Sequence, residues 1–198
     1  MSHRTTLGWE RAKKLAGEII RDGAFDRQQS ADAVLAYFNA DQEQDKILGL
    51  GLLYVFIRSH DDFDVEIGMK QIYEIGNNIP QSKQKEFARE ILYIILTNKR
   101  ITSKWIDKIA DEAVPIFRMS FCRAVEMMAE RKTIDPSRPL GMIRYFLDDP
   151  NPDVRKAVAD VLRTVFLRDS ELLERFINDH MAGAGKYRKS IFNDVLSH

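Results

Sequence analysis

The apolar residues of this 198-residue chain recur at helical rather than strand spacing almost throughout. Between residues 154 and 165, for example, they fall at positions i, i+3, i+4 and i+7, with charged side chains between them. Long runs of alternating apolar and polar residues, which would indicate half-buried strands, are absent from the sequence. The spacing therefore predicts an all-α fold.

Capping residues and helix breakers divide this pattern into about eleven helices. Ser82, Asp64 and Ser170 are expected N-caps, because their side-chain oxygens can accept from the free amides of a first turn. Linkers are short, and no low-complexity stretch marks a domain boundary. The expected helices span residues 6–22, 26–39, 43–59, 64–77, 82–98, 103–112, 114–130, 137–148, 152–167, 170–181 and 185–197.

The second helices of successive pairs begin near residues 43, 82, 114, 152 and 185, so their starts are about 32 to 39 residues apart. Periods of this length are typical of arrays of helical hairpins. The segments 37–41 and 145–149 also resemble each other, and each is followed by a polar turn and a long apolar helix. Stacked pairs cover apolar faces that a single pair leaves open. We expect one domain, residues 1–198, in which 1–24 form an N-terminal capping helix and 25–198 form helix pairs.

Residues 149–162, Asp-Pro-Asn-Pro-Asp-Val-Arg-Lys-Ala-Val-Ala-Asp-Val-Leu, resemble the second half of a HEAT repeat. Pro152 would begin the helix, Asp153 would neutralise free amides in its first turn, and Arg155 could bridge to the next repeat. The resemblance implies a right-handed α-solenoid of about five HEAT-like helix pairs plus the N-terminal helix.

From about Lys104 to Leu196 the order and length of the elements resemble the bacterial alkylpurine DNA glycosylases of the AlkD type. That family excises cationic alkylated bases with a Trp and an Asp four residues apart, an Arg from a later helix and a further aromatic. Arg123 matches the family's arginine. Trp105, however, is followed four residues later by Ile109, and the aligned segment 76–82 contains neither Trp nor Asp. The resemblance therefore implies the scaffold without the catalytic pair.

Thirty Lys and Arg residues balance thirty Asp and Glu residues, so the chain lacks the basic excess typical of nucleic-acid binders. Binding of a polyanion would need a local patch. Basic residues on the second helices of successive pairs could form such a track along a concave face, or they could only bridge repeats. The candidate residues for binding nucleic acid or another partner are Arg123, Arg155, Lys156, Arg163, Lys186, Arg188 and Lys189, with Trp105 as a stacking aromatic.

The sequence predicts no catalytic residue, cofactor or metal site. Cys122 lies in an apolar helix, where cysteines are usually inert. The four histidines lack ligand spacing, and the oxygen-rich stretch 60–64 lacks the rest of a calcium loop. Gly49 and Gly51 lie in an apolar helix, where small residues let another helix approach.

We therefore predict a non-catalytic module that binds a macromolecular partner, protein or nucleic-acid backbone, on its concave face. The alternative is a DNA-alkylation-repair protein that recognises or excises alkylated bases. The N-terminus shows no signal-peptide pattern, and the longest apolar stretch, residues 47–57, is too short to cross a bilayer. A cytoplasmic location and no membrane partner are expected.

Overall fold

The computed structural model describes residues 7–23, 27–59, 65–98 and 101–197. Among these residues the regular structure is helical and no strand occurs, which confirms the all-α prediction. The chain divides into two compact units, Met1–Ile91 and Leu92–His198, and each is described by itself. The expectation of a single domain over residues 1–198 stays a prediction.

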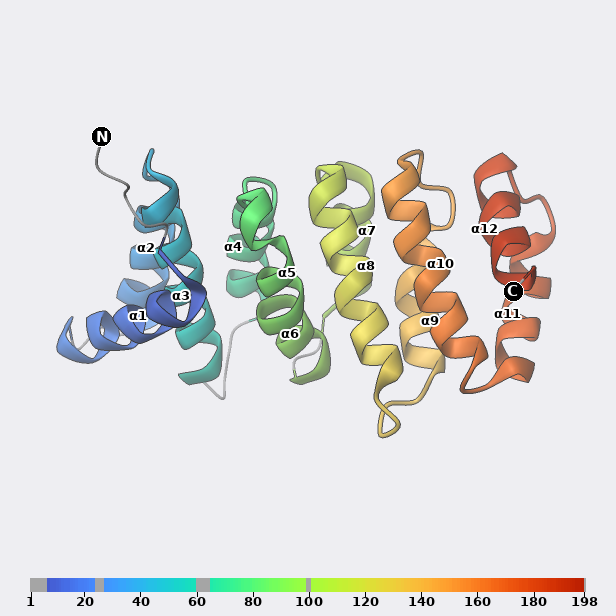
Figure 1. The fold of residues 1–198 in the computed structure, drawn as a ribbon, viewed down its shortest axis with the longest axis horizontal. Coiled ribbons are helices and arrows are strands. Elements are labelled where there is room, and N and C mark those ends of the chain that lie inside the picture. The colour runs from blue at the N-terminus through green and yellow to red at the C-terminus, as the bar shows by residue number, and fades with distance from the viewer. Residues whose placement is uncertain (1–6, 24–26, 60–64, 99–100, 198) are drawn as a thin grey trace. The chain divides into compact units, whose positions relative to one another are not determined.

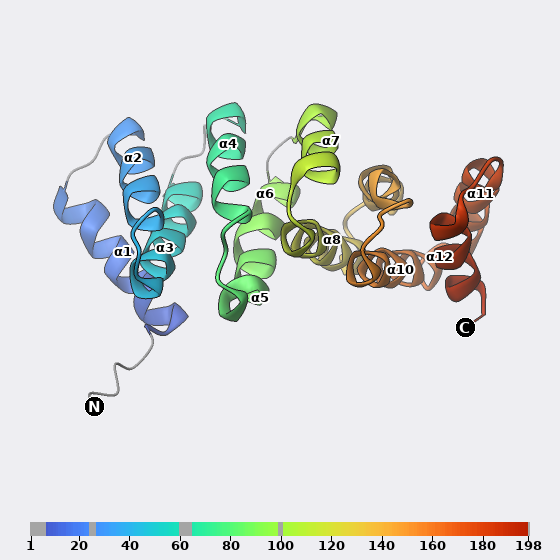
Figure 2. The ribbon, with the colours of Figure 1, turned by 90° about the horizontal axis from the view of Figure 1, so that it is seen from above.

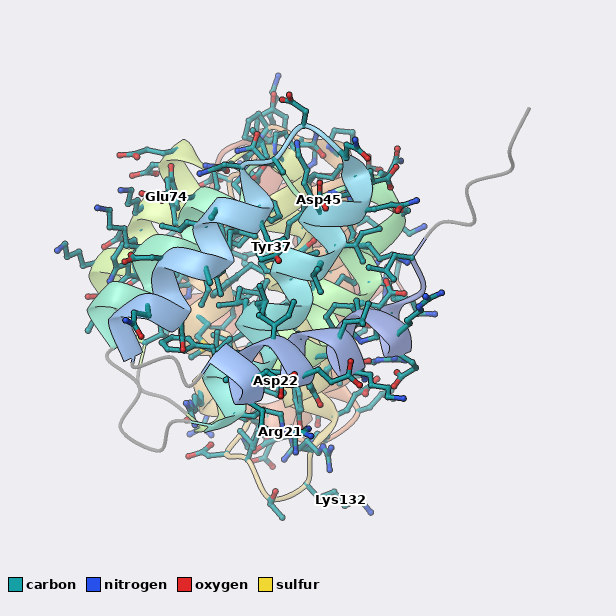
Figure 3. The ribbon with its side chains drawn as sticks, turned by 90° about the vertical axis from the view of Figure 1, so that its left-hand side faces the viewer. Arg21, Asp22, Tyr37, Asp45, Glu74 and Lys132 are labelled. Carbon is teal, nitrogen blue, oxygen red and sulfur yellow. The ribbon has the colours of Figure 1, made fainter. Side chains whose placement is uncertain are left out.

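The first unit is built around one central helix. Helices α1 (Trp9–Gly23) and α2 (Arg27–Phe38) both pack on α3 (Glu43–Ser59), and α4 (Val65–Gly76) packs on α2. Figure 3 looks onto this group and shows α1 running across α3, with Arg21 and Asp22 near one end of α1. The apolar side chains of α3 are thus covered from two sides, and Leu50 and Leu53 are completely buried.

Two glycines of α3 allow this close packing. A Cβ atom on Gly51 would lie 2.8 Å from the carbonyl oxygen of Ala12 in α1. A Cβ atom on Gly49 would lie 2.9 Å from the amide nitrogen of Phe38 in α2. Both distances are too short for real Cβ contacts, so neighbouring backbones approach α3 only because side chains are missing there. The expectation that these glycines admit another helix is confirmed.

The helix expected over residues 82–98 is not a single regular helix. It consists of η1 (Gln81–Lys83), α5 (Gln84–Glu86), the π-helical segment η2 (Phe87–Leu92) and α6 (Tyr93–Asn98). Its fully or nearly fully buried side chains come in adjacent pairs that recur every four residues, Phe87/Ala88, Ile91/Leu92 and Ile95/Leu96. A strict period of four drifts around an ordinary α-helix of 3.6 residues per turn. The wider π turn offsets part of that drift.

The second unit has two rows of helices (Figures 1 and 2). In one row, α10 (Pro152–Phe166) lies between α8 (Pro115–Glu130) and α12 (Lys186–Leu196), and α6 packs on α8. The other row contains α7 (Ser103–Glu112), α9 (Ser137–Ile143) with the 3₁₀ turn η3 (Arg144–Phe146), and α11 (Ser170–Met181). Phenylalanines fill the space between the rows, and the rings of Phe121 and Phe146 lie 5.4 Å apart.

Helix starts in this unit follow local side-chain chemistry. Pro152 occupies the first turn of α10, as expected, and the Asn151 side chain accepts from the amides of Asp153 and Val154 at 2.9 and 3.2 Å. The N-cap of α11 is Asp169, so the expected cap at Ser170 is wrong by one residue. An aspartate oxygen one position earlier already satisfies the free amide of Leu172.

Ser82 is likewise not an N-cap. It lies inside η1, and its hydroxyl donates to the Glu43 carboxylate at 2.9 Å. The residue that precedes η1 is Pro80, whose side chain makes no capping hydrogen bond. The Ser82 hydroxyl, which we expected to cap a helix, therefore makes a tertiary contact with the start of α3 instead.

A buried ion pair joins α8 to the turn before α10. Arg118 donates from Nε to Asp149 Oδ2 at 2.6 Å and from Nη2 to Asp149 Oδ1 at 3.1 Å. Its Nη1 donates to the Ala113 carbonyl, and Asp149 Oδ1 also accepts from the Asn151 amide at 2.8 Å. The two side chains are 10% and 3% exposed. This pair fixes the turn that positions the N-terminus of α10.

Candidate functional site

Two of the candidate arginines belong to a chain of ion pairs across α8, α10 and α12. Arg123 Nη1 lies 2.8 Å from Glu126 and 2.6 Å from Asp160. Arg163 continues the chain, 2.8 Å from Asp160 and 2.6 Å from Asp194. We call these five residues the ion-pair ladder. Asp160 lies at its centre and accepts from both arginines.

The ladder compensates the positive charge of its arginines. Burial alone would lower the pKa of Arg123, but hydrogen bonds and Coulomb attraction from Glu126 and Asp160 raise it above its ordinary value. Two guanidinium groups face three carboxylates, so the ladder is net acidic. Its side chains are between 23% and 48% exposed, and each pair therefore adds little to stability by itself. The sequence left two interpretations of these arginines open, a positive track or bridges between repeats. In the structure, Arg123 and Arg163 make bridging ion pairs between helices.

Other candidate residues gather around a tyrosine at the first turns of α10 and α12. The Arg155 guanidinium lies 4.6 Å and the Lys186 ammonium 4.8 Å from the centre of the Tyr187 ring. Arg155 also donates to the backbone carbonyls of Asp149 and Pro150, at 3.1 and 2.7 Å, so its position is fixed. We call Arg155, Lys186 and Tyr187 the cation–tyrosine cluster.

Two further candidate lysines are exposed on the same two helices. Lys189 follows Lys186 by three residues, a spacing that makes them neighbours on the surface of α12. Lys156 is the exposed neighbour of Arg155 on α10. Arg188 is instead tied to the structure, since it donates to the Asp148 carboxylate and, at 3.2 Å, to the His180 carbonyl.

Trp105, the candidate stacking aromatic, lies in the core. Trp105 is only 4% exposed, and the ammonium groups of Lys104 and Lys108 lie 5.9 and 5.4 Å from the centre of its ring. A nucleic-acid base could not stack on this ring without displacing its neighbours. The structure therefore places Trp105 apart from the surface cluster.

Another group considered from the sequence, the Cys122 thiol, lies in the core. Cys122 is completely buried, and burial, assisted by the nearby Asp149 carboxylate, raises the pKa of its thiol. The stretch 60–64, His3 and His198 lie outside the described residues; within the described ranges no three His, Cys, Asp or Glu side chains are placed to share a metal ion. No helix in the described part of the chain is both long and apolar enough to span a membrane.

Comparison with protein-family models, curated proteins and solved structures finds no match for this chain. The site therefore has to be judged from its own residues. Sequence reasoning missed Tyr187, although the run Lys186-Tyr187-Arg188-Lys189 interleaves an aromatic with cations, a signal that could have singled it out. It also left the acidic partners of the ladder unassigned.

Proposed function

We propose that the protein is a non-catalytic HEAT-like repeat module that binds an acidic segment of a protein partner through the cation–tyrosine cluster. In this proposal the chain forms a right-handed α-solenoid of about five helix pairs, with α1 as its cap. The observation that supports it is the position of Tyr187 beside Arg155 and Lys186, with the exposed Lys189 next to them. An aromatic ring with cations around it offers both contact area and charge to an acidic segment.

The ion-pair ladder favours a protein partner over a nucleic-acid backbone. A phosphate track needs several uncompensated cations in succession, because affinity grows with the number of phosphates neutralised. Arg123 and Arg163 each lie between carboxylates, and Asp160 and Asp194 would repel phosphates approaching the same row. Of the candidate cations named from the sequence, those outside the ladder lie on α10 and α12, and Arg155, Lys186 and Lys189 lie at their first turns, which suits a short acidic segment.

Fluorescence anisotropy with a labelled acidic peptide of about twelve residues tests this proposal. Binding should weaken about tenfold in Tyr187→Ala and in Lys186→Ala, and it should fall as salt rises because exposed charges are screened. Lys132→Ala is the matched control, since Figure 3 shows Lys132 at the loop that follows α8, and this loop lies at the other end of the helices from the first turns of α10 and α12. Equal affinity in all four proteins would contradict the proposal.

The same titration with duplex DNA separates the alternatives. We expect weak binding with a shallow salt dependence. Tight binding that falls steeply with salt and is lost in Arg123→Gln would replace the protein partner with a nucleic-acid backbone. The glycosylase alternative, which the resemblance implies, stays a prediction, and release of free base from methylated DNA is its direct assay.

A further inference from the structure

A groove between α9 and α11 is lined by two arginines and one aspartate, so it contains more positive than negative charge. It has a volume of about 370 Å³, at the lower end of the roughly 300–1000 Å³ typical of small-molecule sites. Leu140 and Leu172 give it an apolar lining, and Phe176 and His180 add two stacked rings whose centres lie 4.2 Å apart. The groove is thus suited to an apolar or aromatic body.

Two arginines, Arg144 and Arg175, also line this groove. Most arginines of the second unit have their charge compensated or held by carbonyls: Arg118, Arg123, Arg163 and Arg188 bind carboxylates, and Arg138, Arg155 and Arg168 donate to backbone oxygens.

Arg144 and Arg175 differ from that majority. Arg144 donates to the Tyr145 hydroxyl at 2.9 Å, and Arg175 Nε donates to the Glu171 carbonyl at a long 3.4 Å. Among the ion pairs of the described residues, neither arginine has a carboxylate partner. Asp179 is the single acidic residue of the lining, so two guanidinium groups exceed its charge.

His180 adds a directional polar atom. Its Nδ1 lies 2.8 Å from the Phe176 carbonyl oxygen, so this nitrogen carries the proton and donates. The other ring nitrogen, Nε2, is then the one left for a ligand. The half-buried ring is held on two sides, by that bond and by the stacked Phe176 ring.

We propose that this groove binds a small aromatic anion, a carboxylate or a phosphate, whose ring lies on the apolar lining and whose charged group is bound by Arg144 and Arg175. Guanidinium groups bind both kinds of anion in a bidentate manner, which gives specificity as well as affinity. The inference does not rest on the proposed partner binding, because the groove lies between α9 and α11 and the cation–tyrosine cluster lies on α10 and α12.

A ¹H–¹⁵N NMR titration of the full chain tests it with phenyl phosphate and phenylacetate as probes. Saturable shifts should concentrate on the amides of α9 and α11, and affinity should exceed that for phenol and for inorganic phosphate by about tenfold. Whichever of the two probes binds more tightly identifies the anion class. Shifts confined to other helices, or equal affinity for phenol, would overturn the proposal.

Variants of the two arginines complete the test. Arg175→Gln and Arg144→Gln should each weaken phenyl phosphate binding about tenfold, while Arg131→Gln, which removes an exposed cation near the Tyr93 ring, should change nothing. Arg175→Lys, which keeps the charge but not the planar fork, should retain part of the affinity. Both arginines are exposed and bind no buried group, so their variants should fold. Unchanged affinity in both glutamine variants would refute the proposal.

Discussion

Replacing Gly51 with alanine tests the close crossing of α1 and α3. The new Cβ atom would lie 2.8 Å from the Ala12 carbonyl oxygen and 2.9 Å from its carbon, both backbone atoms of α1. Because backbone cannot swing aside as a side chain can, α1 as a whole must move away. Overpacking of this kind costs about 1–3 kcal/mol, and alanine recovers about 1 kcal/mol of helix propensity. We therefore expect a net loss of roughly 1 kcal/mol in the docking of α1.

Hydrogen exchange measured by mass spectrometry on peptides from residues 9–23 reports this loss directly. A loss of about 1.4 kcal/mol would make exchange tenfold faster. Gly17→Ala is the matched control, because nothing lies within 4 Å of a Cβ atom at Gly17 in α1 itself. There alanine should slow exchange, because it stabilises the helix by about 0.5–1 kcal/mol relative to glycine. If Gly51→Ala also slowed exchange, the crossing described here would be wrong.

Three further predictions follow from buried or paired groups. Arg118→Ala should cost about 3–5 kcal/mol in urea unfolding because it leaves Asp149 buried without its main partner, whereas replacing both residues with apolar ones should cost much less. Burial alone would raise the pKa of Glu90, but the donors around it, Lys13 at 3.0 Å among them, outweigh burial and lower that pKa. The stabilisation that Glu90 contributes is therefore present above its unfolded pKa near 4.5 and is lost as pH falls through the lower folded value. Lys13→Met should make hydrogen exchange in α1 less sensitive to acid between about pH 5 and pH 3. Cys122 should react with Ellman's reagent only after unfolding, and reaction at the rate of a free thiol in the native protein would contradict its complete burial.

Local signals in the sequence were enough to predict the ends of several helices. The bounds 43–59, 103–112 and 170–181 agree with α3, α7 and α11 as observed. The segment 82–98 shows what the pattern alone did not reveal. Its buried pairs recur every four residues, a period that an α-helix does not match, but residues 91–96 are all apolar or aromatic in the sequence, so the pairs stand out only by their burial in the folded chain.

The candidate site was harder to predict, because its charges are set by residues far apart in the chain. Arg123 and Asp160 are 37 residues apart, and Arg163 and Asp194 are 31 apart. In the composition these residues count as separate charges, whereas in the folded chain each arginine is paired with a distant aspartate. Only side-chain geometry separates a paired arginine such as Arg163 from Arg175, which has no carboxylate partner among the residues that the structure describes.

In the proposed function, the first turns of α10 and α12 select an acidic segment. Charge reversal tests it most directly, by comparing anisotropy titrations of Lys186→Glu/Lys189→Glu and of the unaltered protein with one acidic and one basic peptide of equal length. Acidic residues are favourable at a helix N-terminus, so the variant should keep α12 folded. The unaltered protein should prefer the acidic peptide, and the variant should bind it at least about tenfold more weakly and prefer the basic peptide. Unchanged binding of the acidic peptide by the variant would contradict this proposal.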